Sequence, residues 1–261
     1  MADIVRRVPA LSFIDLSKVL VFVRPGRTGA DGAYASCHSL CVPDSEPGYY
    51  FWRDRESGAV TRRTDWFVTR SPRVCVAGQD LQYLVSFALP RFCDQSLARS
   101  RKASLYNPAL PAWVAKLDTI VHELYHMDPG GQGLRVFERA DGSPLAGLHG
   151  AHFFEDVARM VNEYLDTRPD AELLEFLQHD FDGLTARYGG VVGTTFRQFP
   201  SYPRRYRQLL QPQPAAPQLG DVRIQDLHDT ALTVFSDADL QLREFMPRTS
   251  RPVAAPVPAA A

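Results

Sequence analysis

The segment TIVHELYHMDPGG, residues 119–131, carries two histidines and a glutamate whose spacing suits metal chemistry. His122 and His126 are four residues apart, so in a helix both imidazoles lie on one face and can reach the same ion. Glu123 then points to the edge of that face, where its carboxylate can contact a water molecule on the metal without being a ligand. This is the general-base position of H-E-x-x-H metallopeptidases. The spacing therefore predicts half of a catalytic zinc site.

A catalytic zinc site takes three protein ligands and keeps one coordination position for water. The stretch LHGAHFFEDV, residues 148–157, offers two further histidines downstream of the motif. His149 falls in a loop just before the next predicted helix, and His152 falls inside that helix. Spacing leaves both open as the third ligand. If His152 were a fourth ligand, the site would be closed, as in structural zinc sites.

HELYH followed by HGAHF resembles the SprT-like (Spartan-type) zinc metalloproteases, in which a histidine of an H-G-x-x-F pattern completes the site. Here that pattern is His149, Gly150 and Phe153, so the resemblance implies His149 as the third ligand and Zn²⁺ as the cofactor. A wider stretch, residues 82–166, is similar to a bacterial and phage group assigned as metallopeptidases. No Cys-rich zinc ribbon follows, so the resemblance does not extend to DNA targeting.

The motif predicts metal-assisted hydrolysis of peptide bonds, with Glu123 as the general base. The developing negative charge needs a second positive or hydrogen-bonding partner, and Arg135 is the first candidate, with Tyr125 and Tyr164 as others. Three carboxylates are candidates for orienting the ligand histidines: Asp118, Asp128 and Asp156. The alternative from another class is a non-catalytic binding or scaffold protein that keeps a zincin-like fold around a structural zinc.

The elements needed to hold this site are strands before the motif and helices after it. Short apolar runs bounded by turn residues predict strands at 18–24, 33–42, 48–54, 65–70, 73–78 and 83–90. Helical spacing of apolar residues predicts helices at 111–128, 151–165 and 170–179, the last with Asp170 as its N-cap. Residues 183–196 are interrupted by glycines and indicate a hairpin.

We expect an α+β, zincin-like fold with a mostly antiparallel or mixed sheet packed on the motif helix and a second, later helix. The run YLVSFALP, 83–90, is the expected sheet edge for an extended substrate.

Composition divides the chain and limits its partners. Residues 1–210 are expected to form the metallopeptidase domain, 211–220 a Pro-rich linker, 221–247 a short C-terminal segment and 248–261 a disordered tail.

The net charge of −1 gives no overall attraction to nucleic acid or to an anionic membrane. No apolar run is long enough to cross a bilayer, and the N-terminus lacks the pattern of a secretory signal, so we expect a cytoplasmic protein. The expected partner is a protein or peptide substrate, and the oligomeric state is left open.

Four cysteines precede the motif, at positions 37, 41, 75 and 93. A disulfide framework is not expected in a chain of this length without a secretion signal. Cysteines of this kind are most often small buried apolar residues. A second, structural zinc site formed by all four and a redox role are the alternatives.

Overall fold

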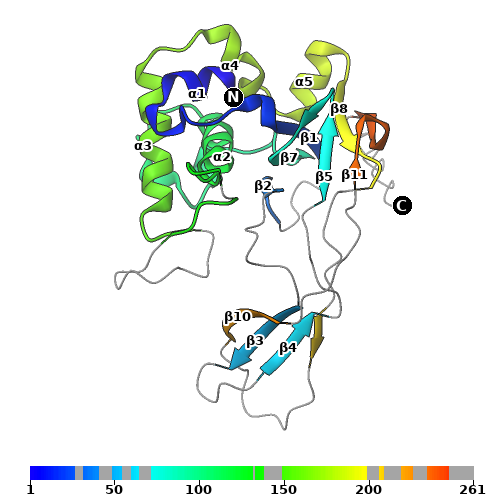
Figure 1. Cartoon of the computed structure of the whole chain (residues 1–261). Helices are drawn as coiled ribbons and strands as arrows, with labels where there is room; N and C mark the ends of the chain where they lie inside the picture. The colour runs from blue at the N-terminus through cyan, green and yellow to red at the C-terminus, as the bar shows by residue number, and fades with distance from the viewer. Residues whose placement is uncertain are drawn as a thin grey trace, which may run out of the picture.

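The computed structural model describes residues 1–26, 32–40, 49–54, 60–64, 72–131, 133–137, 149–198, 206–208, 219–225 and 234–246. These residues form a mixed α+β structure, as expected from the sequence. Helices α1 to α4 gather on one side of the central strands, and β5, β8 and β11 lie on the other side (Figure 1). No described helix has the length and apolar character needed to cross a membrane.

The central sheet has three strands in the order β1-β7-β2. β1 (Val19–Gly26) is parallel to β7 (Tyr83–Pro90), and β2 (Ala35–Ser39) is antiparallel to it. The prediction that 83–90 forms the sheet edge is therefore wrong. Residues 83–89 are buried on both faces of the sheet, and a near-continuous apolar run is typical of such a central strand. The edge strands are β1 and β2.

Five helices complete this part of the molecule: α1 (Ala2–Arg7), α2 (Val114–Tyr125), α3 (Phe153–Asp166), α4 (Ala171–Gln178) and α5 (Phe181–Tyr188). The three predicted helices are confirmed as α2, α3 and α4, and Asp170 caps α4 through a bond from the Glu172 amide. The predicted hairpin at 183–196 is wrong in its first half, because that half lies in α5. Asp180 caps α5, and Gly189 ends it at φ 77° before strand β8 begins.

The main core joins the helices to one face of the central sheet. Leu117, Val121 and Leu124 of α2 are fully buried there, against Val157 and Val161 of α3 and the odd-numbered side chains of β7. A smaller cluster covers the other face and includes Phe22, Val74, Leu84 and Phe196. Short 3-10 turns connect these elements at Pro9–Leu11, Leu16–Lys18, Leu97–Arg99, Ala103–Leu105 and Asp237–Asp239. Helix α2 is thus held between the other helices and the sheet.

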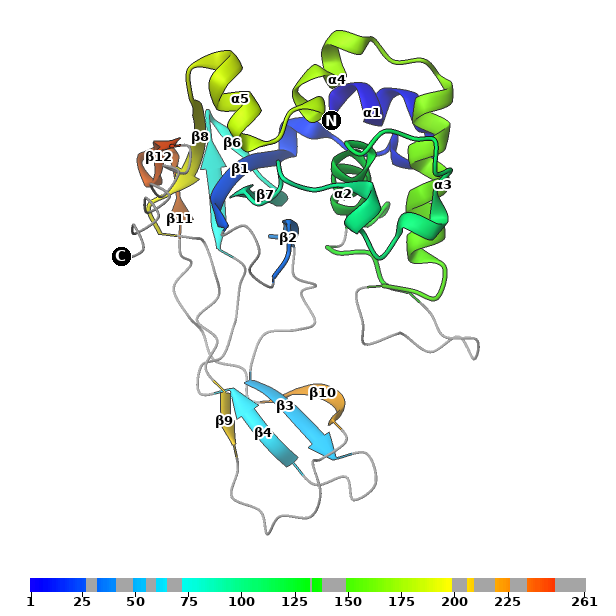
Figure 2. The same cartoon turned by 180° about the vertical axis from the view of Figure 1, so that it is seen from behind.

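The other strands of the described residues form three further sheets. One has the order β10-β3-β4-β9, from Leu219–Gln225, Tyr49–Asp54, Val60–Thr64 and Tyr206–Gln208, and it lies apart from the helices in both views (Figures 1 and 2). The second has the order β11-β5-β6, from Val234–Phe235, Arg73–Val76 and Gln79–Asp80. The third pairs β12 (Leu240–Phe245) with β8 (Val191–Phe196).

These pairings bear on the predicted division of the chain. The described strands of the predicted C-terminal segment, 221–247, pair with β3, β5 and β8 of the first 210 residues. Strand β10 begins at Leu219, inside the predicted linker, and 211–218 lie outside the described residues. The predicted strand at 65–70 and the predicted tail at 248–261 also lie outside them.

A buried lysine ties α2 to the end of α4. The Nζ of Lys116, which is 3% exposed, donates to the carbonyls of Leu177 at 2.9 Å and His179 at 2.6 Å. Burial lowers the pKa of Lys116. The ammonium therefore satisfies carbonyls that the last turn of α4 leaves without helical partners.

Replacing Lys116 with methionine should lower the free energy of unfolding by about 2–3 kcal/mol, because buried carbonyls lose a charged donor. Urea denaturation measures this change. Lys18→Met is the matched control: Lys18 lies in a surface pair with Asp15, and its loss should cost less than about 1 kcal/mol. Equal losses in the two variants would contradict the role of Lys116.

Candidate metal centre

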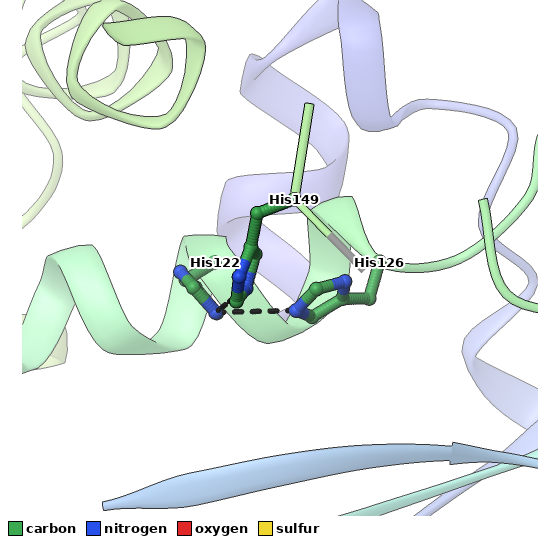
Figure 3. A group of neighbouring side chains, drawn as sticks. All are labelled: His122, His126 and His149. Carbon is green, nitrogen blue, oxygen red and sulfur yellow. Dashed lines mark hydrogen bonds between the residues drawn. The ribbon is translucent and has the colours of Figure 1, made fainter. Parts of the chain in front are cut away.

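Three histidines from two regions of the chain meet beside α2. His122 lies within the helix and His126 is its C-cap residue, while His149 lies in the segment that leads into α3. Their Nε2 atoms point toward one another (Figure 3), at 3.1 Å between His122 and His126 and 3.2 Å between His122 and His149. Among the described residues, this is the one group of histidine, cysteine and carboxylate side chains that could hold a metal ion.

The local sequence explains how His149 reaches the other two. Gly150 lies so close to Phe137 that a Cβ would meet the ring at 2.7 Å, so a glycine is needed for this approach. Phe153, 1% exposed at the start of α3, packs against all three imidazoles with ring centroids 4.6 to 4.9 Å away. The H-G-x-x-F pattern therefore combines a ligand, a close approach and an apolar support for the histidine cluster.

The turn after α2 gives the chain its direction toward this cluster. Pro129 follows the helix, and Gly131 and Gly133 adopt positive φ angles of 69° and 112°. The chain then returns along the helix end, where the amide of Arg135 donates to the carbonyl of His126 at 2.7 Å. The hydroxyl of Tyr83, from β7, donates to the carbonyl of Gly133 at 2.8 Å and anchors the turn to the central sheet.

The geometry and the protonation of the cluster fit a bound metal ion. Tetrahedral ligation of zinc, with Zn–N bonds of about 2.0–2.1 Å, places ligand nitrogens about 3.3–3.4 Å apart. The two distances from His122 are close to this value, and the ligand atoms of all three histidines lie within 4.8 Å of one another. Burial, together with the positive charge of Lys102, lowers the pKa of His122 to about 2. Burial and the neighbouring His149 lower the pKa of His126 to about 4, and burial also lowers the pKa of His149. The imidazoles are therefore neutral near pH 7, the form that binds metals.

Glu123 lies on the face of α2 that meets the edge of the central sheet, and it is 5% exposed. Burial raises the pKa of its carboxyl group to about 7, while a hydrogen bond from the backbone of Cys37 and the charges of Lys102 and Arg24 oppose the rise. The carboxyl group is thus buried next to the histidine cluster.

A cavity of about 340 Å³ opens between α2 and β2. The helix side contributes the three histidines, Glu123 and Thr119, the sheet side contributes residues 33–37, and Lys102 and Leu134 complete the lining. The hydrogen bonds between β2 and β7 show which backbone groups of β2 point toward the cavity. Ala88 donates to Tyr34 O and Leu40 donates to Gln82 O, both at 2.8 Å, so the even-numbered residues of β2 bond to β7. The amide and carbonyl of Cys37 therefore point away from β7, toward Glu123.

Lys102 lines the cavity, although it lies in a segment for which the sequence predicted no strand or helix. Its Nζ pairs with the carboxylate of Asp118 and lies 3.4 Å from Nδ1 of His122. Tyr106 donates its hydroxyl to the second oxygen of Asp118 at 2.6 Å. Of the three predicted orienting carboxylates, Asp118 lies nearest to a histidine of the cluster, but Lys102 stands between them, and its ammonium group cannot accept the Nδ1 proton of a metal-bound imidazole. A basic loop carries no periodic signal, so the sequence did not single out Lys102.

Arg135 and the two tyrosines proposed beside it do not line the cavity. The Nε of Arg135 donates to the carbonyl of Tyr125 at 2.9 Å, and its guanidinium lies over the Tyr125 ring at 4.3 Å. Tyr125 donates its hydroxyl to Asp156, and Tyr164 donates its hydroxyl to Asp3 of α1 at 2.9 Å. The prediction of Arg135 as the partner of developing negative charge therefore stays a prediction, and in the structure its guanidinium contacts Tyr125 at the end of α2.

The structure also shows what the other predicted site residues contact, namely Asp156, Asp128 and His152. Asp156 contacts Tyr125 and Arg159 rather than a histidine, and the backbone amide of Asp128 closes the turn through Gly133. His152 is the exposed N-cap residue of α3 and is not a member of the histidine cluster. The structure thus brings His149, and not His152, to His122 and His126.

The described cysteines form no second metal site. Cys37, Cys75 and Cys93 are free, and none belongs to the group that could hold a metal. Burial raises the pKa of Cys37 and raises that of Cys93 to about 12, so neither thiol is activated at neutral pH. Cys41 lies outside the described residues.

Comparisons with known protein families, curated proteins and solved structures found no match to this chain. The relation to the SprT-like proteases therefore stays a prediction from the HELYH and HGAHF residues. The histidine geometry supports a metal-binding site without reference to any relative.

Proposed function

We propose that this protein is a zinc-dependent metallopeptidase. The observation that carries the proposal is the convergence of three Nε2 atoms next to the buried carboxyl group of Glu123. His122, His126 and His149 would hold the ion. A zinc ion bound there supplies a Lewis acid for the substrate carbonyl and lowers the pKa of a water molecule. Glu123 accepts the proton of that water and returns it to the leaving amide nitrogen.

The edge of β2 supports an extended peptide as the substrate. Because the carbonyl of Cys37 faces the cavity, while its amide bonds to Glu123, a peptide strand could pair with this edge through that carbonyl. Such a strand would lie between β2 and the face of α2 that carries His122 and Glu123. β2 takes the role that the sequence had suggested for residues 83–90.

The competing function, a scaffold with a structural zinc, requires a closed ligand set. His152 was the candidate for the fourth ligand, and it lies outside the cluster. A buried carboxyl group with a raised pKa beside the ligands also has no use in a structural site. Both observations favour the catalytic function.

The test is a metal-dependent cleavage assay on an unfolded, fluorescently labelled protein. We expect the purified chain to bind one zinc per molecule, to cleave this substrate, to lose cleavage with a chelator and to regain it with Zn²⁺ but not Mg²⁺, since the three ligand atoms are imidazole nitrogens. A folded, zinc-loaded protein that leaves every unfolded substrate intact would refute the proposal.

A further inference from the structure

Two arginines contact the start of β2, at two residues that line the cavity, although neither arginine lines it. Arg24, near the end of β1, donates from Nη2 to the carbonyl of Ala33 at 3.0 Å. The guanidinium of Arg91, which follows β7, lies 4.7 Å from the centre of the Tyr34 ring. Ala33 and Tyr34 both line the cavity. Both guanidinium groups are thus attached to the wall of the candidate active site.

Neither arginine forms an ion pair with any carboxylate of the described residues. This distinguishes them from Lys102, which lines the cavity and whose charge is paired with Asp118. Burial and the positive charge of Arg91 lower the pKa of Arg24, and the carboxylate of Glu123 partly offsets this. Two like charges therefore lie near each other without a described counter-ion, and Arg24 is near enough to the catalytic carboxylate to interact with it.

The position of this pair along β2 relates it to the bond that would be cleaved. Glu123 meets β2 at Cys37, and Tyr34 precedes Cys37 by three residues, about 10 Å along a strand at about 3.3 Å per residue. Antiparallel pairing, the more stable kind, would run the substrate opposite to β2. Its C-terminal part would then pass over Tyr34 and reach the two guanidinium groups.

Building on the proposed peptidase function, we propose that Arg24 and Arg91 form a subsite for an acidic side chain of the substrate, about three residues C-terminal to the cleaved bond. A carboxylate is the chemistry that the pair would recognise, because guanidinium groups donate parallel hydrogen bonds to planar oxyanions. The subsite would select acidic peptides and set their register on β2.

Peptide binding to the zinc-loaded Glu123→Gln variant tests the subsite without depending on turnover. Fluorescent peptides of one extended sequence would carry glutamate in place of glutamine at each position in turn, and anisotropy would give each Kd. We expect one position at which glutamate binds about tenfold more tightly than glutamine. In the Glu123→Gln background, Arg91→Glu should abolish this preference and favour lysine at the same position, a gain that a misfolded protein cannot produce.

Arg168→Glu is the control with the same change of charge. Arg168 is exposed and follows the far end of α3, about 20 Å of helix from Phe153, so the preference for glutamate should remain. Peptides that bind without any preference for glutamate, peptides that do not bind, or a preference that survives Arg91→Glu would each overturn the proposal. The two proposals separate in the wild-type protein: peptides cleaved without charge preference reject only the subsite, and selective binding without cleavage rejects only the peptidase.

Discussion

Replacing Glu123 with glutamine should reduce kcat for peptide cleavage by about 10²–10⁴-fold while leaving one zinc bound per chain. The carboxyl group is buried beside the histidines without belonging to their cluster, so the amide removes the proton acceptor and keeps the ligands. The glutamine is nearly isosteric and can still accept the hydrogen bond from Cys37 through its amide oxygen. Initial rates on an unfolded substrate and metal analysis of the same sample measure both quantities.

The control for this prediction is Glu172→Gln, the same change at an exposed position in the first turn of α4. Its cleavage rate and zinc content should match those of the wild type. If Glu123→Gln cleaved as fast as this control, Glu123 would not be the base. If it lost its zinc, the carboxylate would be a ligand instead, and the assignment of roles at the site would be wrong.

Replacing His149 with alanine should weaken zinc binding by more than about 100-fold, because losing a direct ligand must cost at least as much as losing one of its outer hydrogen-bond partners. His149 is exposed in the segment before α3, so the fold should persist in the variant. His152→Ala, three residues away, should keep the affinity of the wild type, since His152 lies outside the cluster. Competition with a chromophoric chelator gives both constants.

Circular dichroism of the two histidine variants supplies the remaining control, because a loss of zinc means little in a protein that has unfolded. Two folded variants in which His152→Ala loses the metal and His149→Ala keeps it would show that the third ligand was assigned wrongly. If both folded variants lost their zinc, His149 and His152 would both be ligands. The site would then have four protein ligands, which favours the structural-zinc function.

Local spacing accounts for most of what could be predicted at the metal centre. Two histidines four residues apart lie on one face of any helix, and the apolar positions Leu117, Val121 and Leu124 place that helix in the core. The end of the motif helix before Pro129 and the N-cap of α4 at Asp170 likewise depend on neighbouring residues, and the structure has both where the sequence predicted them. These features depend on backbone geometry within one or two turns.

Features that depend on which elements become neighbours were the ones that the sequence did not decide. The run 83–90 is equally apolar whether it lies at the edge or the centre of a sheet, and only its pairing with β1 and β2 shows that it is central. Arg135 follows the motif closely, but its guanidinium is used at the end of α2. Lys102 comes from a loop without periodicity and reaches His122 because Asp118 and Tyr106 hold that loop against the helix.

From the amino-acid sequence we could therefore infer the ligand pair, the candidate base and the helix that carries them, and the resemblance of HGAHF implied His149 as the third ligand. The convergence of His149 with the other two histidines, the β2 edge and the arginine pair at its start became visible in the folded chain. The physical reason is the range of the interactions. Helix periodicity and capping act between residues a few positions apart, whereas strand order and the contacts of long cationic side chains join residues that are distant in the chain.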